Sequence, residues 1–291
     1  MITTVERGGV TLRESRIVLH AGLGEKHTFV QLSDMHLTAE DGSNDELARS
    51  RAEFWAVQGG VFRGEQRVYP AEVAGIVCER IREIAPEAVF FTGDTVDYPS
   101  VANFRAAKRL LDSLGTRLIF VPGNHDEVGE DAPDELRLAF RELVGEIRDF
   151  SVTRLVPGLD AIILDDGHVR VTARQVELVR KQLDRSETAG ERVLILAHAP
   201  FLTASAMWPT RKMWGFSWMV GEEASGEDGK AMARLLRERR DVIAAVFAGH
   251  IHRESGDGEG VRYGEQYDPD DVRQFTAAPA LGGFYRVIEI D

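Results

Sequence analysis

Short apolar runs alternate along this chain with longer amphipathic stretches, and this alternation limits the possible folds more than any other feature. Six runs have the length of buried strands: 27–33, 88–92, 118–121, 161–164, 193–197 and 242–248. The stretches with helical spacing of apolar residues are 70–85, 101–114, 133–144, 172–184 and 230–240. Repetition of strand, helix and strand predicts an α/β fold.

Both ends of the chain have β character. Residues 3–7 and 10–20 alternate partially around a Gly8-Gly9 turn, and the tail from 272 to 290 returns to a strand pattern. We find no internal repeat, low-complexity tract or linker, which favours one domain over residues 1–291. The only cysteine, Cys78, lies in an apolar helical stretch, where we expect a small buried hydrophobic side chain.

Two connections, 39–69 and 203–229, are longer than ordinary strand-to-helix loops and suggest lid-like insertions. The first contains Trp55. The second contains the remaining aromatic and cationic candidates for substrate contact: Trp208, Arg211, Lys212, Trp214 and Trp218. Aromatic walls with one or two cations would suit a planar, anionic organic phosphate. The alternative is that these rings pack the loops onto the domain or form a dimer contact.

Residues of metal-ligand type follow five of the predicted strands. They are Asp34, His36, Asp94, Asn124, His198, His250 and His252. Ligands bind at the carboxyl edge of α/β sheets, and i, i+2 pairs such as Asp34 and His36 point to one side in extended backbone. Mixed imidazole, carboxylate and amide donors favour Mn, Fe, Zn, Co or Ni over Ca. Neighbouring glycines would let the backbone approach the site closely.

Each motif taken alone has an ordinary explanation. Asp34-x-His36 could be a loop coincidence, and His198 could simply be hydrogen-bonded. The 123–126 segment, Gly-Asn-His-Asp, has the composition of a turn, and 250–252 could be a surface strand. Their weight comes from their order and from their shared position at strand ends.

In that order, the sequence resembles the calcineurin-like metallophosphoesterases. The motifs are Asp34-x-His36, Gly93-Asp94, Gly123-Asn124-His125-Asp126, His198 and Gly249-His250-x-His252. The resemblance implies a four-layer αββα sandwich, with two mixed sheets flanked by helices and a dinuclear metal site at the strand ends. It implies one metal held by Asp34, His36, His252 and a shared Asp94, and a second held by Asp94, Asn124, His198 and His250. His125 would face the leaving group, and Asp126 would orient His125.

Departures from the family patterns narrow the resemblance. Leu37, Tyr98 and Asp126 stand where Ser/Thr protein phosphatases have Gly, Arg and Glu, so the usual phosphate-clamping arginine is missing. Asp97 stands where purple acid phosphatases have a tyrosine ligand. The tail over 274–290 looks more like the bacterial cyclic-nucleotide phosphodiesterase branch. We expect His168 to be a solvent-facing loop residue, although it could line the site.

These observations predict a metal-dependent phosphoesterase that hydrolyses a small phosphodiester or phosphomonoester, possibly a nucleotide. Two divalent or mixed-valence transition metal ions, Mn, Fe or Zn, would hold the attacking hydroxide between them. A nuclease of the same superfamily and a non-catalytic metal-binding module are the alternatives. The net charge of −13 disfavours a polynucleotide partner, and no apolar run is long enough to span a membrane. The polar N-terminus does not resemble a signal peptide, so we expect a cytoplasmic protein.

Overall fold

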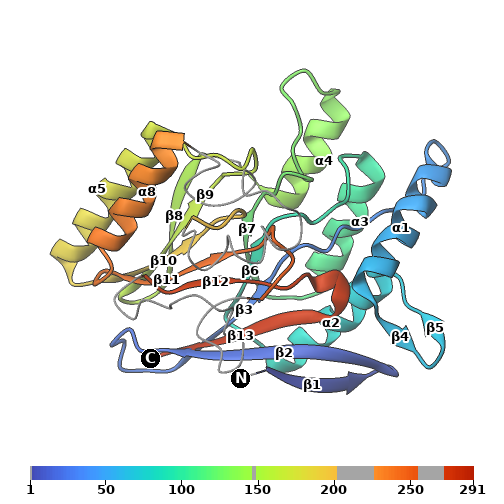
Figure 1. Ribbon diagram of the computed structural model, residues 1–291, viewed down its shortest axis with the longest axis horizontal. Coiled ribbons are helices and arrows are strands. Elements are labelled where there is room, and N and C mark those ends of the chain that lie inside the picture. Colours follow the sequence, from blue (N-terminus) through green and yellow to red (C-terminus); the bar gives the residue numbers. More distant parts are fainter. Residues whose placement is uncertain (1, 146–148, 202–225, 255–271) are drawn as a thin grey trace.

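Two β-sheets lie face to face between two groups of helices, as the computed structural model of the protein shows (Figure 1). The structure describes residues 2–145, 149–201, 226–254 and 272–291. The first sheet contains, in spatial order, β1 (Ile2–Arg7), β2 (Val10–Leu19), β13 (Phe284–Ile290), β3 (His27–Leu32), β6 (Ala88–Thr92) and β7 (Arg117–Val121). The second contains β12 (Gln274–Thr276), β11 (Ile243–Ala248), β10 (Arg192–Leu196), β9 (Leu159–Leu164) and β8 (Phe150–Val156).

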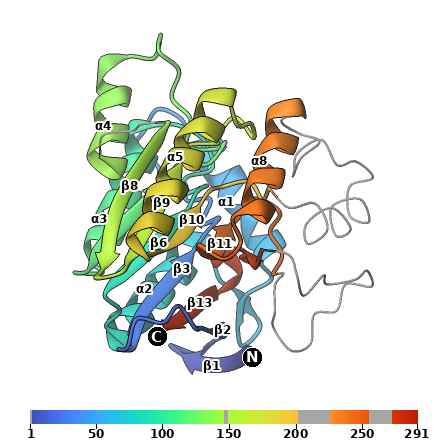
Figure 2. The ribbon, with the colours of Figure 1, turned by 90° about the vertical axis from the view of Figure 1, so that its left-hand side faces the viewer.

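Helices cover the outer face of each sheet (Figure 2). The first sheet is covered by α2 (Pro70–Ile84), α3 (Val101–Asp112) and α4 (Asp134–Val144), with α1 (Asp45–Gly59) beside α2. The second is covered by α5 (Ala173–Ala189) and α8 (Gly226–Glu238). The expected four-layer αββα sandwich is therefore confirmed.

Aromatic side chains fill the space between the two sheets. The rings of Phe29 and Phe90 stack with centroids 5.2 Å apart, and those of Phe247 and Phe275 stack at 5.5 Å. All four side chains are buried in one cluster with residues from both sheets. Since β6 and β11 are covered on both faces, their sequences are continuous apolar runs and do not alternate.

The strand directions bring several carboxyl ends to one edge. Strands β3, β6 and β7 run parallel to one another in the first sheet. Strands β9, β10, β11 and β12 run parallel in the second. The residues that follow these strands are consequently close together in space, although they lie far apart in the sequence.

The segment 39–69 differs from the expected loop. It forms helix α1 and a short hairpin of β4 (Phe62–Arg63) and β5 (Gln66–Arg67). Asp45 and Glu46 lie in the first turn of α1, where acidic side chains interact favourably with the helix dipole. The helix is capped at its end by Gly60, which has a left-handed conformation. The sequence pattern also missed strand β8.

Part of the sequence prediction falls outside the described residues. This holds for most of the second long connection and for its five candidate substrate contacts, Trp208, Arg211, Lys212, Trp214 and Trp218. Cys78 lies within the described part and is buried in α2, as expected. Among the helices that the structure describes, none combines the length and apolar character needed to cross a membrane.

Candidate metal centre

The candidate ligands project from short turns that follow five parallel strands. They are Asp34 and His36 after β3, Asp94 after β6, Asn124 after β7, His198 after β10, and His250 and His252 after β11. Backbone hydrogen bonds hold the turns against one another. The amide of Asp34 donates to the carbonyl of Gly93 at 2.9 Å, and that of Gly249 donates to the carbonyl of His198 at 2.8 Å.

Most of these ligands have a backbone conformation that is rare for residues with a side chain. Of the seven non-glycine residues with positive φ in the described part of the chain, five are candidate ligands: Asp34, His36, Asp94, His250 and His252. Their φ angles lie between 45° and 67°. The i, i+2 pairs are thus brought together by left-handed turns, and the expectation of extended backbone is wrong. Such conformations cost roughly 1–3 kcal/mol each and cluster at functional sites.

Two glycines allow the strand ends to meet. A Cβ atom on Gly123 would lie 2.3 Å from Asp94 Oδ1 and 2.9 Å from His198 Cε1. A Cβ atom on Gly249 would lie 2.7 Å from Asp34 Oδ2. Any larger residue at either position would displace a candidate ligand, so the expected role of these glycines in close approach is confirmed.

The first donor cluster contains Asp34, His36, Asp94 and His252, whose ligand atoms all lie within 4.8 Å of one another. His36 Nε2 lies 3.7 Å from Asp94 Oδ2, and His252 Nε2 lies 3.3 Å from Asp34 Oδ1. His36 Nε2 and His252 Nε2 are only 2.9 Å apart. This is the set that the family resemblance implies for one metal ion.

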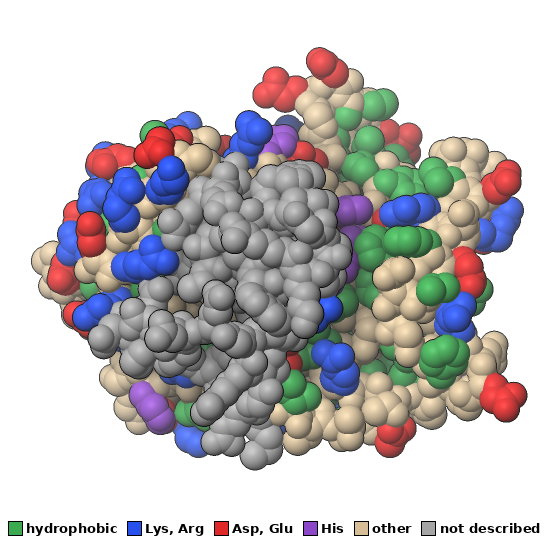
Figure 3. All heavy atoms as spheres, viewed as in Figure 1, with side chains coloured by type: hydrophobic (Ala, Val, Ile, Leu, Met, Phe, Trp, Pro, Cys, Tyr) green, Lys and Arg blue, Asp and Glu red, His purple; other side chains and the backbone are tan. Residues whose placement is uncertain are grey.

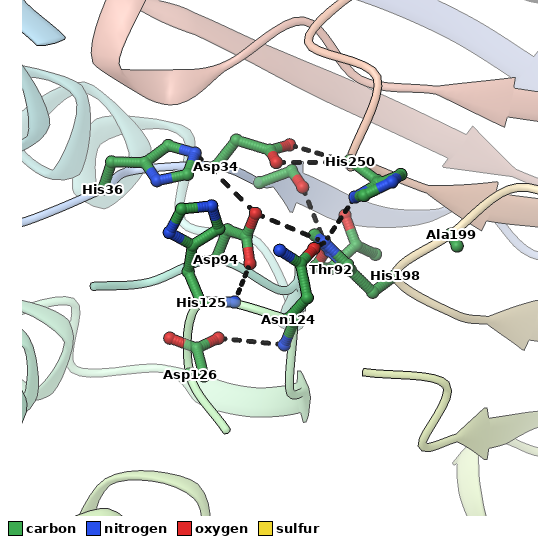
Figure 4. A network of polar contacts seen from close by, with 12 residues as sticks. Asp34, His36, Thr92, Asp94, Asn124, His125, Asp126, His198, Ala199 and His250 are labelled. Atoms are coloured by element: carbon green, nitrogen blue, oxygen red, sulfur yellow. Dashed lines mark hydrogen bonds and ion pairs between the residues drawn. The ribbon is translucent and has the colours of Figure 1, made fainter. Parts of the chain in front are cut away.

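The second donor cluster contains Asp94, His198 and His250, again within 4.8 Å. His198 Nε2 lies 3.3 Å from Asp94 Oδ2, and Asn124 Oδ1 lies 3.1 Å from the same nitrogen (Figure 4). His250 Nδ1 lies 3.2 Å from His198 Nε2. Asp94 belongs to both clusters, as a bridging ligand must.

The chemistry of the donors fits two transition metal ions. Two pairs of imidazole nitrogens face each other, and at most one proton can lie between the two nitrogens of each pair. Burial lowers the pKa of His250 to about 4 and lowers the pKa of His36 well below its usual range, so both rings are neutral, as metal ligands must be. Burial opposes a charge on His198, but the Asp94 carboxylate outweighs burial and raises the pKa of that imidazole to about 10. A metal ion bound to this ring would displace its proton.

His125 lies beside both clusters and is partly exposed, with Nδ1 2.6 Å from the backbone carbonyl of Asp97. The Asp126 carboxylate points elsewhere: it accepts hydrogen bonds from the amides of Thr95, Val96 and Gly123 at 2.9–3.1 Å. The expectation that Asp126 orients the His125 ring is therefore wrong. Asp126 instead ties together the two loops that carry Asp94, Asn124 and His125.

Sequence reasoning missed a second loop-tying carboxylate, Asp166. It is buried and accepts from the amides of His198 and Ala199 at 2.7 and 3.0 Å. Burial raises the pKa of this carboxyl group to about 7. A signal was present, because Asp166 follows a predicted strand as the ligands do. The neighbouring His168 is mostly exposed and pairs with Glu127, as expected for a loop histidine.

Asp97 also lies against the centre, and helix α1 supplies its partners. Arg51 donates to both carboxylate oxygens at 2.5 and 2.7 Å, and Trp55 Nε1 donates at 2.5 Å. The Trp55 indole stacks on the ring of His36, with centroids 3.9 Å apart and planes 16° apart. Trp55 thus packs helix α1 against the candidate metal centre. This agrees with the alternative that the tryptophans pack the long connections onto the domain.

The centre opens into a cavity of about 720 Å³. Asp94, His125 and His250 line it. The other lining residues include Ile2, Arg13, Phe54, Gln58 and Leu281. A cavity of this size lies within the range of small-molecule sites.

Solved structures with the same fold include enzymes of metal-dependent phosphate chemistry. A dimetal phosphatase from Danio rerio matches with a TM-score of 0.57 and 15% identity, covering 88% of each chain. A purple acid phosphatase from yellow lupin seeds matches with a TM-score of 0.53 and 13% identity, covering 94% of this chain and 46% of the other. At these identities the likeness shows the fold alone.

Sequence relatives are described as cyclic nucleotide phosphodiesterases. A cAMP/cGMP dual specificity phosphodiesterase of Mycobacterium tuberculosis is 26% identical over 204 residues, which cover 65% of this chain and 58% of the relative. A probable cyclic nucleotide phosphodiesterase of Vesicomyosocius okutanii is 20% identical over 179 residues, covering 61% of this chain and 67% of the relative. The chain thus spans well under two thirds of the mycobacterial relative.

The family match covers the whole metal centre. Residues 27–254 match the model of the calcineurin-like phosphoesterases. This range includes every candidate ligand from Asp34 to His252 and every strand of the two sheets except β1, β2, β12 and β13. The chain belongs to the calcineurin-like phosphoesterase family.

Proposed function

We propose that this protein is a metal-dependent phosphodiesterase for small substrates of the cyclic nucleotide type. One observation carries the proposal: two donor clusters share Asp94 beside His125, and together they open into a cavity of about 720 Å³. The similarity to relatives described as cyclic nucleotide phosphodiesterases supports this substrate class.

The first metal ion would be held by Asp34, His36, His252 and Asp94, and the second by Asp94, Asn124, His198 and His250. When bound, two divalent ions activate water for attack and neutralise charge on the phosphate oxygens. The mixture of carboxylate, imidazole and amide donors supports Mn, Fe or Zn.

His125 would protonate the leaving oxygen. Its Nδ1 is 2.6 Å from the Asp97 carbonyl, which can only accept a hydrogen bond, so Nδ1 carries a proton. The second nitrogen, Nε2, is then the atom that gains or loses the proton used in the reaction. The amide of His125 also donates to Asp94 Oδ1 at 2.9 Å, which fixes the residue relative to the donor clusters.

The charges near the centre favour a diester over a monoester. A phosphomonoester carries two negative charges at neutral pH, whereas a diester carries one. Tyr98 occupies the position of the phosphate-clamping arginine, and the guanidinium of Arg51 is bound to Asp97. Arg13 and Arg253 also line the cavity, but neither stands at the clamping position, so we expect the diester to be the better substrate.

A polynucleotide substrate is disfavoured by charge. The net charge is −13, and on the described part of the face in Figure 3 the Lys and Arg side chains are interspersed with Asp and Glu. A nuclease needs positive potential along a strand's length to offset phosphate repulsion. A small cyclic diester needs positive potential at one phosphate only.

The test is hydrolysis by purified protein loaded in turn with Mn²⁺, Fe²⁺ or Zn²⁺. Substrates would be cAMP, cGMP, bis(p-nitrophenyl) phosphate and p-nitrophenyl phosphate. We expect metal-dependent turnover with a higher kcat/KM for the diesters, abolished in His198→Ala and unchanged in His20→Ala, an exposed histidine beside Asp291. A preference for the monoester would overturn the diester assignment. Absence of turnover with every metal would favour the non-catalytic alternative.

A further inference from the structure

The carboxylate of Asp97 is buried at the metal centre yet belongs to neither donor cluster. Its side chain is 0% exposed. Oδ1 lies 3.9 Å from His36 Nδ1 and 3.7 Å from His125 Nδ1, and these three residues form a further group that could hold a cation. An uncompensated carboxylate here would compete with the two clusters for His36 and for metal ions.

Helix α1 compensates this carboxylate. Arg51 and Trp55 lie four residues apart, on one face of the helix. Arg51 contacts both oxygens in a bidentate manner, and Trp55 Nε1 adds a second donor to Oδ1. A bidentate arginine is a strong and geometrically specific partner. Both lone pairs of Oδ1, the oxygen that faces His36, are thereby occupied.

The same helix fixes the plane of His36. The indole of Trp55 lies parallel to the imidazole, 3.9 Å away between centroids, and Trp55 is itself 8% exposed. A ring held in this plane keeps Nε2 directed at Asp94 and His252, 3.7 and 2.9 Å away. Without the stack, the ring could rotate toward Asp97 on its other side.

We propose that Arg51 and Trp55 are positioning residues that keep Asp97 out of metal coordination and hold His36 in the first donor cluster. Arg51 acts through Asp97, and Trp55 acts through both Asp97 and His36. The inference concerns metal binding, so only its kinetic consequence rests on the proposed phosphodiesterase function.

The primary experiment measures Mn²⁺ binding without substrate, by equilibrium dialysis and elemental analysis. For Trp55→Leu we expect one of two Mn²⁺ sites to weaken by roughly 10- to 100-fold, the usual effect of removing a residue that orients a metal ligand. Trp55→Phe keeps a ring on His36 and should recover much of that affinity. Arg51→Leu should change the stoichiometry or weaken the same site, because Asp97 is then free to compete.

Two matched controls lie on the same stretch of chain. Arg49→Leu removes an exposed arginine of α1 that pairs with Glu40, and Phe62→Leu removes an exposed aromatic ring of β4. Both should bind two Mn²⁺ with unchanged affinity. Circular dichroism would establish that every variant is folded.

Folded Trp55→Leu and Arg51→Leu proteins that bind two Mn²⁺ with wild-type affinity would overturn the inference. Equal weakening in Trp55→Phe and Trp55→Leu would remove the role of the stack. If the protein binds metals as expected but hydrolyses no phosphodiester, the proposed function fails and this inference stands.

Discussion

Asp94 differs from the other candidate ligands because its carboxylate faces both donor clusters. Oδ2 lies 3.7 Å from His36 Nε2 and 3.3 Å from His198 Nε2, while Oδ1 accepts the amide of His125 at 2.9 Å. The neighbouring imidazoles outweigh the effect of burial and hold the pKa of Asp94 well below its usual range. A single carboxylate would therefore supply negative charge to two cations, and it also holds the backbone of His125.

Replacing Asp94 should affect both metal ions, whereas replacing a ligand of one cluster should affect mainly one. We expect Asp94→Ala to lose metal stoichiometry as well as activity, because two cations would be left without the charge that screens them from each other. His36→Ala should lose mainly one metal. Elemental analysis of the purified variants measures this, and two metals per chain in Asp94→Ala would show that the bridging assignment is wrong.

His125 should matter for the reaction and not for metal binding. We expect His125→Ala to keep its metals and to lose about 10²–10⁴ in rate, the usual contribution of a positioned acid. The loss should shrink for esters whose leaving group needs no proton, such as a nitrophenolate. Equal losses for good and poor leaving groups would exclude the acid role.

The helix α2 buries the single cysteine of the chain on its inner face. Cys78 is 0% exposed, and burial raises the pKa of its thiol to about 12. Since the thiolate is the reactive form, we expect no modification of the native protein by a thiol reagent at pH 8 and one modified thiol per chain after unfolding. Rapid modification of the folded protein would contradict the packing of α2.

The end of α2 holds a conformation better suited to glycine. Ala85 caps the helix with φ 50° and is exposed, and its amide donates to the carbonyl of Ile81. A left-handed residue with a Cβ costs roughly 1–2 kcal/mol. We therefore expect Ala85→Gly to raise the free energy of unfolding by about 1 kcal/mol, measured by urea denaturation. A lower midpoint with an unchanged slope would refute this.

The strands that precede the candidate ligands could be predicted from the sequence, whereas helix α1, which supports the site, could not. Strands β6 and β11 are buried on both faces, so their sequences are unmistakable apolar runs. Helix α1 buries only Ala48, Trp55 and Ala56, and such a narrow stripe gives little periodic signal. The position of α1 is set by tertiary contacts such as the Arg51–Asp97 pair, which the local sequence does not reveal.

The roles of the acidic residues around the site could not be predicted from the sequence either. The family resemblance implied that Asp126 orients the ring of His125, yet the Asp126 carboxylate accepts hydrogen bonds from three backbone amides. The partner of an acidic side chain depends on where loop amides point, and residue order does not encode this. The candidate metal ligands were easier to propose from the sequence because they share a chemistry and a position at strand ends.

The candidate metal centre lies between the two halves of the sandwich and takes residues from both. Asp34, Asp94 and Asn124 come from turns of the first sheet, and His198 and His250 come from turns of the second. Metal ions that bind these residues together bind the folded chain and not the unfolded one. Binding must then stabilise the whole fold, because the donors come together only when both sheets are formed.

Metal loading should therefore raise the thermal stability of the protein. A ligand at 100 times its Kd stabilises the folded state by about 2.7 kcal/mol for one site, and two sites add when both are filled. We expect Mn²⁺ or Zn²⁺ to raise the Tm measured by calorimetry, and a chelator to reverse the increase. Asp94→Ala should show a much smaller increase at the same metal concentration, because it lacks the carboxylate common to both clusters. An equal increase in both proteins would mean that the ions act at surface carboxylates, which are abundant in a chain with 48 Asp and Glu residues and a net charge of −13.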